Sequence, residues 1–299
     1  MCEILQPAYA GCAYRFSFGL SPVGKLGICY WASLPVAGLD PILSHWSPHA
    51  LTFKPYHLYM CNLIAPTSRE KVVLRHLVEP FKGHYGVTAG PLQPAPIITR
   101  SSALVAQWGM IPPRSNSRIP TLPSGARMST NNARRERMAT APTYRDAWRR
   151  GQRCLIPADS YDEPYWGTGK NIWWRFWRAD GEPWALAGFW SEWTDPASGE
   201  VVPNFTMITQ NCDGHPLLGL MHKPDPKLPA DQQDKRTIVS LEPHQWDQWL
   251  NGSNDQAESL IKVPGIELFK HGAADPSKNF DILQGPHQST ATPVQQMLL

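Results

Sequence analysis

The chain has 299 residues, of which 42% are hydrophobic and 18% are charged, and its formal net charge is only +3. This length suffices for one large domain or two small ones, and any basic patch must be local because the charges nearly balance. No apolar run reaches the roughly 18 residues that a membrane-spanning helix needs. The N-terminus has no basic stretch followed by an apolar core, so it does not indicate a secretory signal.

The six cysteines include no Cys-x-x-Cys pair. This spacing argues against a structural zinc site, so we expect neither a metal nor a cofactor. Because no export signal is present, we expect the thiols to be reduced and the protein to be cytoplasmic, with no membrane partner.

The first 59 residues differ from the rest, since they carry only two acidic and three basic side chains and show no helical or strand period. They are either a weakly ordered extension or an upstream stretch that is not translated, because Met60 could be the true start. We therefore expect an N-terminal extension over 1–59, one domain over 60–270 and a polar tail over 271–299.

Regular elements are predicted after Met60. Thr67 and Glu70 form a capping box for a helix over 68–80. Further helices are expected at 143–148, from Pro243 onward and at 255–262. Short strands are expected at 94–98, 104–111, 154–156, 172–178, 184–190, 205–210 and 236–241, with 172–190 forming a hairpin. The pattern predicts an α+β fold in a single domain, with a mainly antiparallel, barrel-like β core and a few short flanking helices.

A basic segment lies between residues 127 and 153, where eight arginines are opposed only by Glu136 and Asp146. Arginine without lysine favours planar, bidentate contacts to phosphate. A solvated charged face explains the same run equally well. Tryptophan-rich strands follow, and alternation puts Trp174 and Phe176 on one face and Trp173 and Trp177 on the other. One face belongs to the core; the other could stack bases, although packing under loops explains most of these rings.

Three of the cysteines are considered as possible nucleophiles. Cys154 lies in an apolar strand and is expected to be inert, and Cys212 lies in a loop with no clear role. Cys61 follows Met60 directly, so loss of the preceding residues would leave a free α-amine beside a thiol. Their pKa values of about 8 and about 8.5 make both partly nucleophilic at neutral pH. Such a 1,2-aminothiol condenses with an aldehyde to form a thiazolidine.

Two further side chains could assist that reaction. Glu163 is placed in a strand-to-turn segment, where partial burial would raise the pKa of its carboxyl group. His222 lies in a proline-containing loop. The chain has ten histidines, and spacing alone does not select this one.

Six segments in order resemble the SOS response-associated peptidase (SRAP) family, whose members process abasic sites. The resemblance spans about residues 60 to 250. The matching segments are Met-Cys-Asn at 60–62, Trp-Gly-Met-Ile-Pro at 108–112, Asn-Ala-Arg-Arg-Glu at 132–136, Arg-Cys-Leu-Ile-Pro-Ala-Asp-Ser-Tyr-Asp-Glu at 153–163, Phe-Thr-Met-Ile-Thr at 205–209 and Met-His-Lys-Pro at 221–224.

The resemblance implies a sensor of abasic sites in single-stranded DNA. Cys61 matches the family's N-terminal cysteine, which forms a thiazolidine crosslink with the ring-opened sugar aldehyde. Asn132, Glu163 and His222 match its other catalytic residues. It further implies autoproteolysis that frees the cysteine and Schiff-base lyase-type chemistry. The protein would act as a monomer and join the nucleoid when bound to DNA. The candidate DNA contacts are Arg134, Arg135, Arg149, Arg150 and Trp108.

Two departures from the family pattern bear on the site. Ser-Tyr-Asp-Glu-Pro at 160–164 stands where the family has Gly-Phe-Tyr-Glu-Trp, and Lys223-Pro224 stands where Arg-Met-Pro is commoner. Lys223 is expected to lower the pKa of His222. Two other functions stay open: a thiol peptidase acting on protein, with Cys61 as nucleophile and His222 as base, and a non-catalytic module that binds single-stranded DNA.

Overall fold

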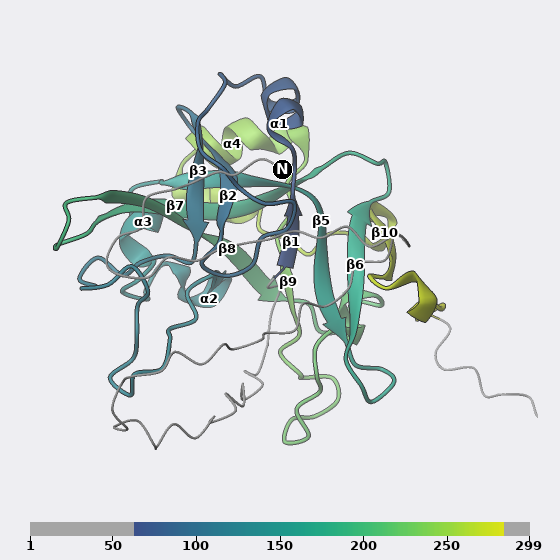
Figure 1. Ribbon diagram of the computed structural model, residues 1–299. Coiled ribbons are helices and arrows are strands. Elements are labelled where there is room, and N and C mark those ends of the chain that lie inside the picture. Colours follow the sequence, from purple (N-terminus) through teal and green to yellow (C-terminus); the bar gives the residue numbers. More distant parts are fainter. Residues whose placement is uncertain (1–62, 284–299) are drawn as a thin grey trace, which may run out of the picture. The chain divides into compact units, whose positions relative to one another are not determined.

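The computed structural model describes residues 63–283 (Figure 1). The predictions for Cys61, for the extension over 1–59 and for residues 284–299 lie outside this range.

Five strands close into a barrel, and β5 is the strand at which the ring begins and ends. Around the barrel the order is β5 (Arg153–Tyr165), β2 (Pro94–Thr99), β3 (Ala103–Trp108), β8 (Val201–Asn211) and β7 (Trp184–Thr194). Every neighbouring pair is antiparallel except β3 with β8, which is parallel. The prediction of an α+β domain with a mainly antiparallel, barrel-like core is confirmed.

The remaining strands extend β5 and β8 beyond the barrel. The second half of β5 lies between β1 (Leu63–Pro66) and β6 (Ile172–Arg178), and β10 (Phe269–Ala273) pairs with β6. The far end of β8 pairs with β4 (Asn132–Arg134) and β9 (Arg236–Ile238). Both β5 and β8 therefore leave the barrel and continue into a flanking sheet.

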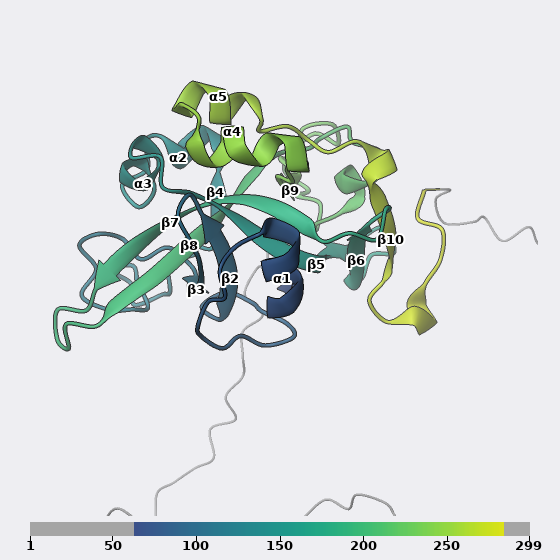
Figure 2. The same ribbon diagram turned by 90° about the horizontal axis from the view of Figure 1, so that it is seen from above.

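The helices are short, and Figure 2 shows α4 and α5 together along one side of the strands. The α-helices are α1 (Arg69–His76), α2 (Arg135–Met138), α3 (Arg145–Arg149), α4 (Trp246–Asn251) and α5 (Asn254–Ser259). Single 3₁₀ turns are formed at Leu218–Leu220, Pro243–Gln245, Ile266–Leu268 and Pro276–Lys278.

Aromatic side chains fill two apolar clusters. One contains Trp108, Trp174, Trp184 and Phe205, and the other contains Trp148, Phe189 and Trp249. The alternation along β6 is as expected, because Trp174 and Phe176 are buried while Trp173 and Trp177 are partly exposed. Such rings each bury roughly 150–250 Å², so the tryptophan-rich segments are chiefly core.

The first helix differs from its prediction at both ends. Ser68 caps it in place of Thr67, since its hydroxyl accepts from the Lys71 N–H at 3.4 Å. The helix stops at His76 because Leu77 adopts a left-handed φ of 51°. That conformation breaks the helical hydrogen-bond series before Pro80 is reached.

Strand β5 is much longer than the expected 154–156. Pro157 and Pro164 suggest breaks in the sequence, yet both lie within the strand, opposite Ala185 and Trp173. Proline only removes a donor, and the Pro164 carbonyl still accepts a hydrogen bond, from His222 N–H at 2.6 Å. Ordered structure also continues past the expected tail boundary at 270, because β10 pairs with β6 and Ile282 is buried in the core.

Arg153 belongs to the core, although the sequence groups it with the basic segment. It is only 2% exposed, and its guanidinium donates to the carbonyls of Trp249 and Gly252 and to Asn254 Oδ1. The Arg153 side chain thus fixes the end of α4 and the start of α5 to β5.

Replacing Arg153 with Met should therefore destabilise the domain, because the buried Trp249 carbonyl and the partly buried Gly252 carbonyl lose their donor. We expect a loss of about 3 kcal/mol in unfolding free energy, measured by urea denaturation. The matched control is Arg150→Ala, whose side chain is exposed, and it should change stability by less than about 0.5 kcal/mol. Equal effects of the two substitutions would contradict this role for Arg153.

Candidate active site

The carboxyl group of Glu163 is buried inside the sheet. Residue 163 is 2% exposed and lies on the same face of β5 as the buried Tyr161 and Tyr165. Asp162 points to the other face, where Arg175 donates two hydrogen bonds to its carboxylate at 2.7 and 2.8 Å. Alternation thus separates the two neighbouring acids. Asp162 is held in an ion pair across β5 and β6, and Glu163 lies inside among aromatic rings. The prediction of a turn at Glu163 is corrected: this residue is in a strand.

His222 is held beside Glu163 by the backbone. Its N–H donates to the Pro164 carbonyl, and Met221 forms an isolated bridge with Tyr165. The φ of His222 is 62°, a left-handed conformation that costs a non-glycine residue of the order of 1 kcal/mol. The end of β5 therefore positions the histidine as well as the acid.

Lys235 secures this strained turn from the opposite side. Its buried ammonium donates to the carbonyls of Met221 and His222 at 2.7 and 2.6 Å. Burial lowers the pKa of Lys235. Sequence reasoning missed this residue, because no local pattern distinguishes a buried lysine from the exposed Lys227 nearby. The one available signal is its place directly before a predicted strand.

The hydrogen bonds of His222 fix its tautomer. Nε2 lies 2.9 Å from the Arg236 carbonyl, which can only accept, so Nε2 carries the proton. Nε2 is also 3.6 Å from Glu163 Oε2. Nδ1 is then a deprotonated acceptor, buried and without a hydrogen-bond partner among residues 63–283. The site therefore offers a neutral histidine with one unused lone pair next to a buried acid.

The charge that acts on His222 comes from a different lysine than expected. Burial lowers the pKa of His222 to about 4, and Lys235 lowers it further while the Arg236 carbonyl opposes the shift. Lys223 instead lies over Trp166, with its ammonium 5.3 Å from the ring centroid. The prediction that Lys223 lowers the pKa of His222 is thus corrected in favour of Lys235.

Asn132 and Arg134 lie on β4, on the other side of β8 from β7. Asn132 is buried, and the Tyr144 hydroxyl donates to its carbonyl at 3.4 Å. Arg134 donates to Asp234 Oδ2 at 2.7 Å, and the other Asp234 oxygen is 3.3 Å from Arg236. The carbonyl of Arg236 also accepts the hydrogen bond from His222 Nε2. Contacts through Arg236 and Asp234 therefore connect His222 to Arg134 on β4.

The other candidate arginines lie on the helices. Arg135 is 3.6 Å from Glu258, Arg149 pairs with Asp146, and Arg150 donates to Gln152 at 2.8 Å. All three are exposed or partly exposed, and such ion pairs contribute little. They are therefore able to exchange their present partners for phosphate, and their role in DNA binding stays a prediction.

Trp108 requires a correction. It is 0% exposed, its indole N–H donates to the Asn131 carbonyl at 2.8 Å, and its ring is stacked on Phe205. A ring enclosed in this way cannot stack on a base. Its contribution is to hold Asn131 and hence the start of β4.

Cys154 and Cys212 are both buried. Burial raises the pKa of Cys154 well above its ordinary value, and burial together with Glu163 raises the pKa of Cys212 to about 12. Both thiols stay protonated and unreactive at neutral pH. Within residues 63–283, no group of three or more His, Cys, Asp or Glu side chains is arranged to hold a metal ion.

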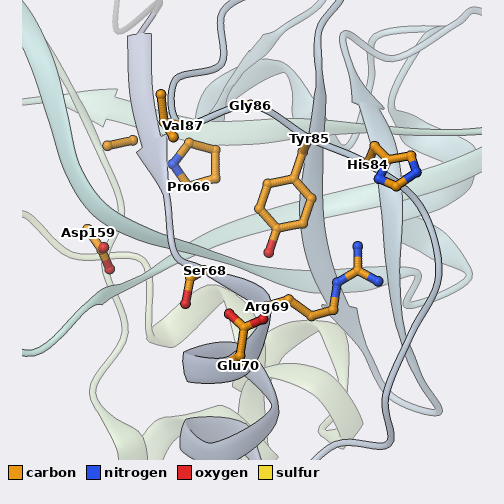
Figure 3. Close-up of a pocket in the computed structure, with 10 residues that line it drawn as sticks. Pro66, Ser68, Arg69, Glu70, His84, Tyr85, Gly86, Val87 and Asp159 are labelled. Carbon is orange, nitrogen blue, oxygen red and sulfur yellow. The ribbon is translucent and has the colours of Figure 1, made fainter.

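The surface formed by residues 63–283 includes two pockets of similar volume. The first, of about 400 Å³, lies at the start of α1 and includes Glu70, Tyr85 and Asp159 (Figure 3). Its polar groups serve the fold, since Arg69 donates to Phe81 O at 2.6 Å and the Tyr85 hydroxyl donates to Thr67 O at 3.0 Å. The second, of about 440 Å³, is lined by His222 and Lys235 and therefore adjoins the site.

A closed barrel that buries a carboxyl group beside a neutral histidine is a candidate site for proton transfer. A family model, SOS response associated peptidase (SRAP), matches residues 60–270. This chain therefore belongs to the SRAP family. Members are associated with the DNA-damage response, with a peptidase-like role and with DNA binding.

Solved structures agree with this assignment. A protein from Bordetella bronchiseptica is 28% identical, with a TM-score of 0.63 over 71% of this chain and 99% of that one. A protein from Bacteroides thetaiotaomicron shares the fold at 20% identity, with a TM-score of 0.58 over 71% and 91% of the two chains. No curated protein matches this chain. In the described part of the chain, no helix has the length and apolarity to cross a membrane.

The low pKa of His222 predicts a pH-dependent stability. The unfolded chain binds a proton at this residue near pH 6.5, and the folded chain only near pH 4. The unfolded state therefore holds more protons between these values, and stability falls as the pH falls from 6.5 to 4, by up to about 3 kcal/mol.

The comparison variant is His222→Asn, because asparagine tolerates a left-handed φ. Urea denaturation between pH 7 and pH 4.5 should give a shallower loss of stability in the variant than in the wild type. The partly buried His76, whose pKa is also lowered to about 4, is present in both proteins and accounts for part of the common slope. Parallel curves would contradict a neutral, buried His222.

Proposed function

We propose that this protein detects abasic sites in single-stranded DNA by forming a thiazolidine crosslink through Cys61 as the N-terminal residue. The observation that carries the proposal is the direction of β1. Leu63 pairs with Asp162, and moving back along β1 leads toward Glu163. Cys61 is two residues before Leu63, which limits the distance between their Cα atoms to about 7 Å. The strand that follows Cys61 in the sequence thus pairs with the strand that carries the buried acid, and this supports Cys61 as the reacting residue.

The chemistry proceeds through an imine. The cyclic hemiacetal of the abasic sugar first opens, with Glu163 donating a proton to the ring oxygen while the anomeric hydroxyl loses its own. The α-amine of Cys61 adds to the aldehyde carbon, and the resulting hydroxyl leaves as water. The thiolate then attacks the imine carbon, whose C–N π electrons return to nitrogen with a proton. The net change is loss of one water molecule.

The buried residues suit these steps. His222 Nδ1 has the lone pair to accept the thiol proton and to return it to the ring nitrogen. Asn132 is neutral, so hydrogen bonding to it orients the amine without a charge that would shift its pKa. The same histidine and acid serve the reverse reaction and lyase-type chemistry at the imine.

The amine exists only after the residues before Cys61 are gone. Either translation starts at Met60 and the methionine is removed, or Cys61 cleaves the preceding peptide bond, which would account for the peptidase in the family's name. In the second case His222 acts as the base for the thiol.

Intact-mass spectrometry tests the proposal. A chain that begins at Cys61 should gain the mass of a single-stranded oligonucleotide with one abasic site, minus one water. Cys61→Ala should gain nothing, whereas Cys154→Ala should react as the wild type does because that thiol is buried and protonated. A crosslink in Cys61→Ala, or in a chain that keeps residues 1–60, would contradict the proposal. Non-covalent binding alone would favour the binding-module alternative, and cleavage of added protein would favour a general peptidase.

Arg134 should contact phosphate, and its partner Asp234 should compete with the DNA. Arg134→Ala is expected to weaken binding and to reduce the slope of log K against log salt by about 1. Asp234→Asn releases Arg134 and should tighten binding up to about fivefold at low salt. Asparagine also accepts the positive φ of residue 234, which is 51°. Fluorescence anisotropy with an oligonucleotide that lacks an aldehyde measures both effects.

The control for Asp234→Asn is Asp247→Asn on α4, which removes the same charge away from Arg134. It should leave affinity almost unchanged. If the two substitutions tighten binding equally, the effect reflects net charge and the assigned role of Arg134 is wrong.

A further inference from the structure

We propose that the pocket beside His222 receives the nucleobase of a nucleotide adjacent to the abasic site. This inference rests on the proposed function and adds a base-binding subsite to it. The pocket has a volume of about 440 Å³, within the range of roughly 300–1,000 Å³ that holds small molecules.

The burial of the reactive groups requires such a subsite. Glu163 and His222 are only 2% and 5% exposed, so a sugar that reacts beside them must press into the protein surface. The neighbouring bases, if stacked along the strand, would collide with that surface. At least one of them must therefore leave the stack, and it loses its stacking partner unless the protein supplies one.

The pocket supplies apolar walls at the required place. Leu220, Pro224 and Leu228 contribute aliphatic surface, Trp166 contributes a partly exposed indole ring, and His222 belongs to the lining. Lys223 lies over the Trp166 ring and is exposed, which leaves a positive charge near the pocket for a backbone phosphate. Flat apolar surface with a nearby cation fits a nucleobase and its phosphate.

Prolines and internal hydrogen bonds hold the loop that forms the pocket wall. Residues 224, 226 and 229 are prolines, which restrict the backbone of this loop. The Gln233 amide donates to the carbonyls of Asp225, Leu228 and Pro229 at 3.2, 3.0 and 2.8 Å, and its oxygen accepts from Asp225 N–H at 2.7 Å. A preformed cavity binds without the entropic cost of ordering a loop.

The other pocket is less suitable for a nucleic acid. Its lining includes Arg69 together with Glu70 and Asp159, and it includes neither Glu163 nor His222. The pocket beside His222 combines proximity to the site with a nearby cation.

The experiment uses oligonucleotides that carry tetrahydrofuran at the lesion position, which cannot crosslink. In two further oligonucleotides, the base on the 5′ side or on the 3′ side is also replaced by tetrahydrofuran. In the wild type, one of these two losses should weaken binding at least tenfold, and the other less than threefold. In Leu228→Ser and in Ala230→Trp, which remove or fill the pocket wall, that tenfold difference should shrink below threefold.

Leu228 is 43% exposed, so Leu228→Ser should fold normally, and Leu77→Ser on the distant exposed end of α1 provides the matched control. Leu77→Ser should keep the full tenfold base dependence.

The pocket proposal is overturned if neither neighbouring base matters in the wild type, or if the base dependence is the same in the pocket variants. A protein that forms the thiazolidine but lacks base dependence refutes the pocket alone. A protein with base dependence but no thiazolidine supports the pocket and refutes the crosslinking chemistry.

Discussion

Strand β5 is the constraint on which the fold and the site both depend. Its first half closes the barrel between β2 and β7, and its second half runs between β1 and β6. Because the strand is continuous, the closed barrel sets which face of its second half is buried. Glu163 is thereby placed among aromatic rings, and Asp162 is directed to Arg175. The last carbonyls of the same strand then determine where His222 lies.

The site is built around a histidine that is kept neutral. Burial disfavours the imidazolium, and the ammonium of Lys235 disfavours it further while securing the backbone of the same turn. Lys235 therefore has a mechanical and an electrostatic effect on one residue. From there, contacts run through Arg236 and Asp234 to Arg134 at the surface. Exposed ion pairs at the outer end exchange easily, whereas the buried inner end is fixed.

Local patterns in the sequence sufficed for most of the fold. The alternation over 172–178 predicts the bounds and the faces of β6, because burial alternates from Trp173 to Arg178. The full length of β5 could not be predicted, since Pro157, Pro164 and three acids resemble a turn and are accommodated only by tertiary partners. Arginine side chains posed a similar problem: Arg153 and Arg150 are alike in sequence, and only the position of α4 and α5 separates a core residue from an exposed one.

The same limit applies to the site residues. Glu163 and His222 were identified through a resemblance, and the structure brings their side chains to 3.6 Å. Trp108 was misjudged because a tryptophan near a basic segment suits stacking and core packing equally well until its surroundings are known. Lys235 was missed because its importance comes from two carbonyls on a different loop. Local sequence reveals chemistry, but it does not reveal which distant backbone atoms surround a side chain.

The connectivity of the barrel also sets when the Glu163–His222 pair is assembled during synthesis. The parallel pairing of β3 with β8 joins Trp108 to Phe205, so the ring cannot close until β8 has left the ribosome. His222 and Lys235 emerge later still. A nascent chain thus presents the segment around residue 61 long before it holds an assembled acid and histidine. The crosslinking that we propose therefore requires the completed domain, because a chain truncated before β9 lacks Lys235 and the Arg236 carbonyl that hold His222.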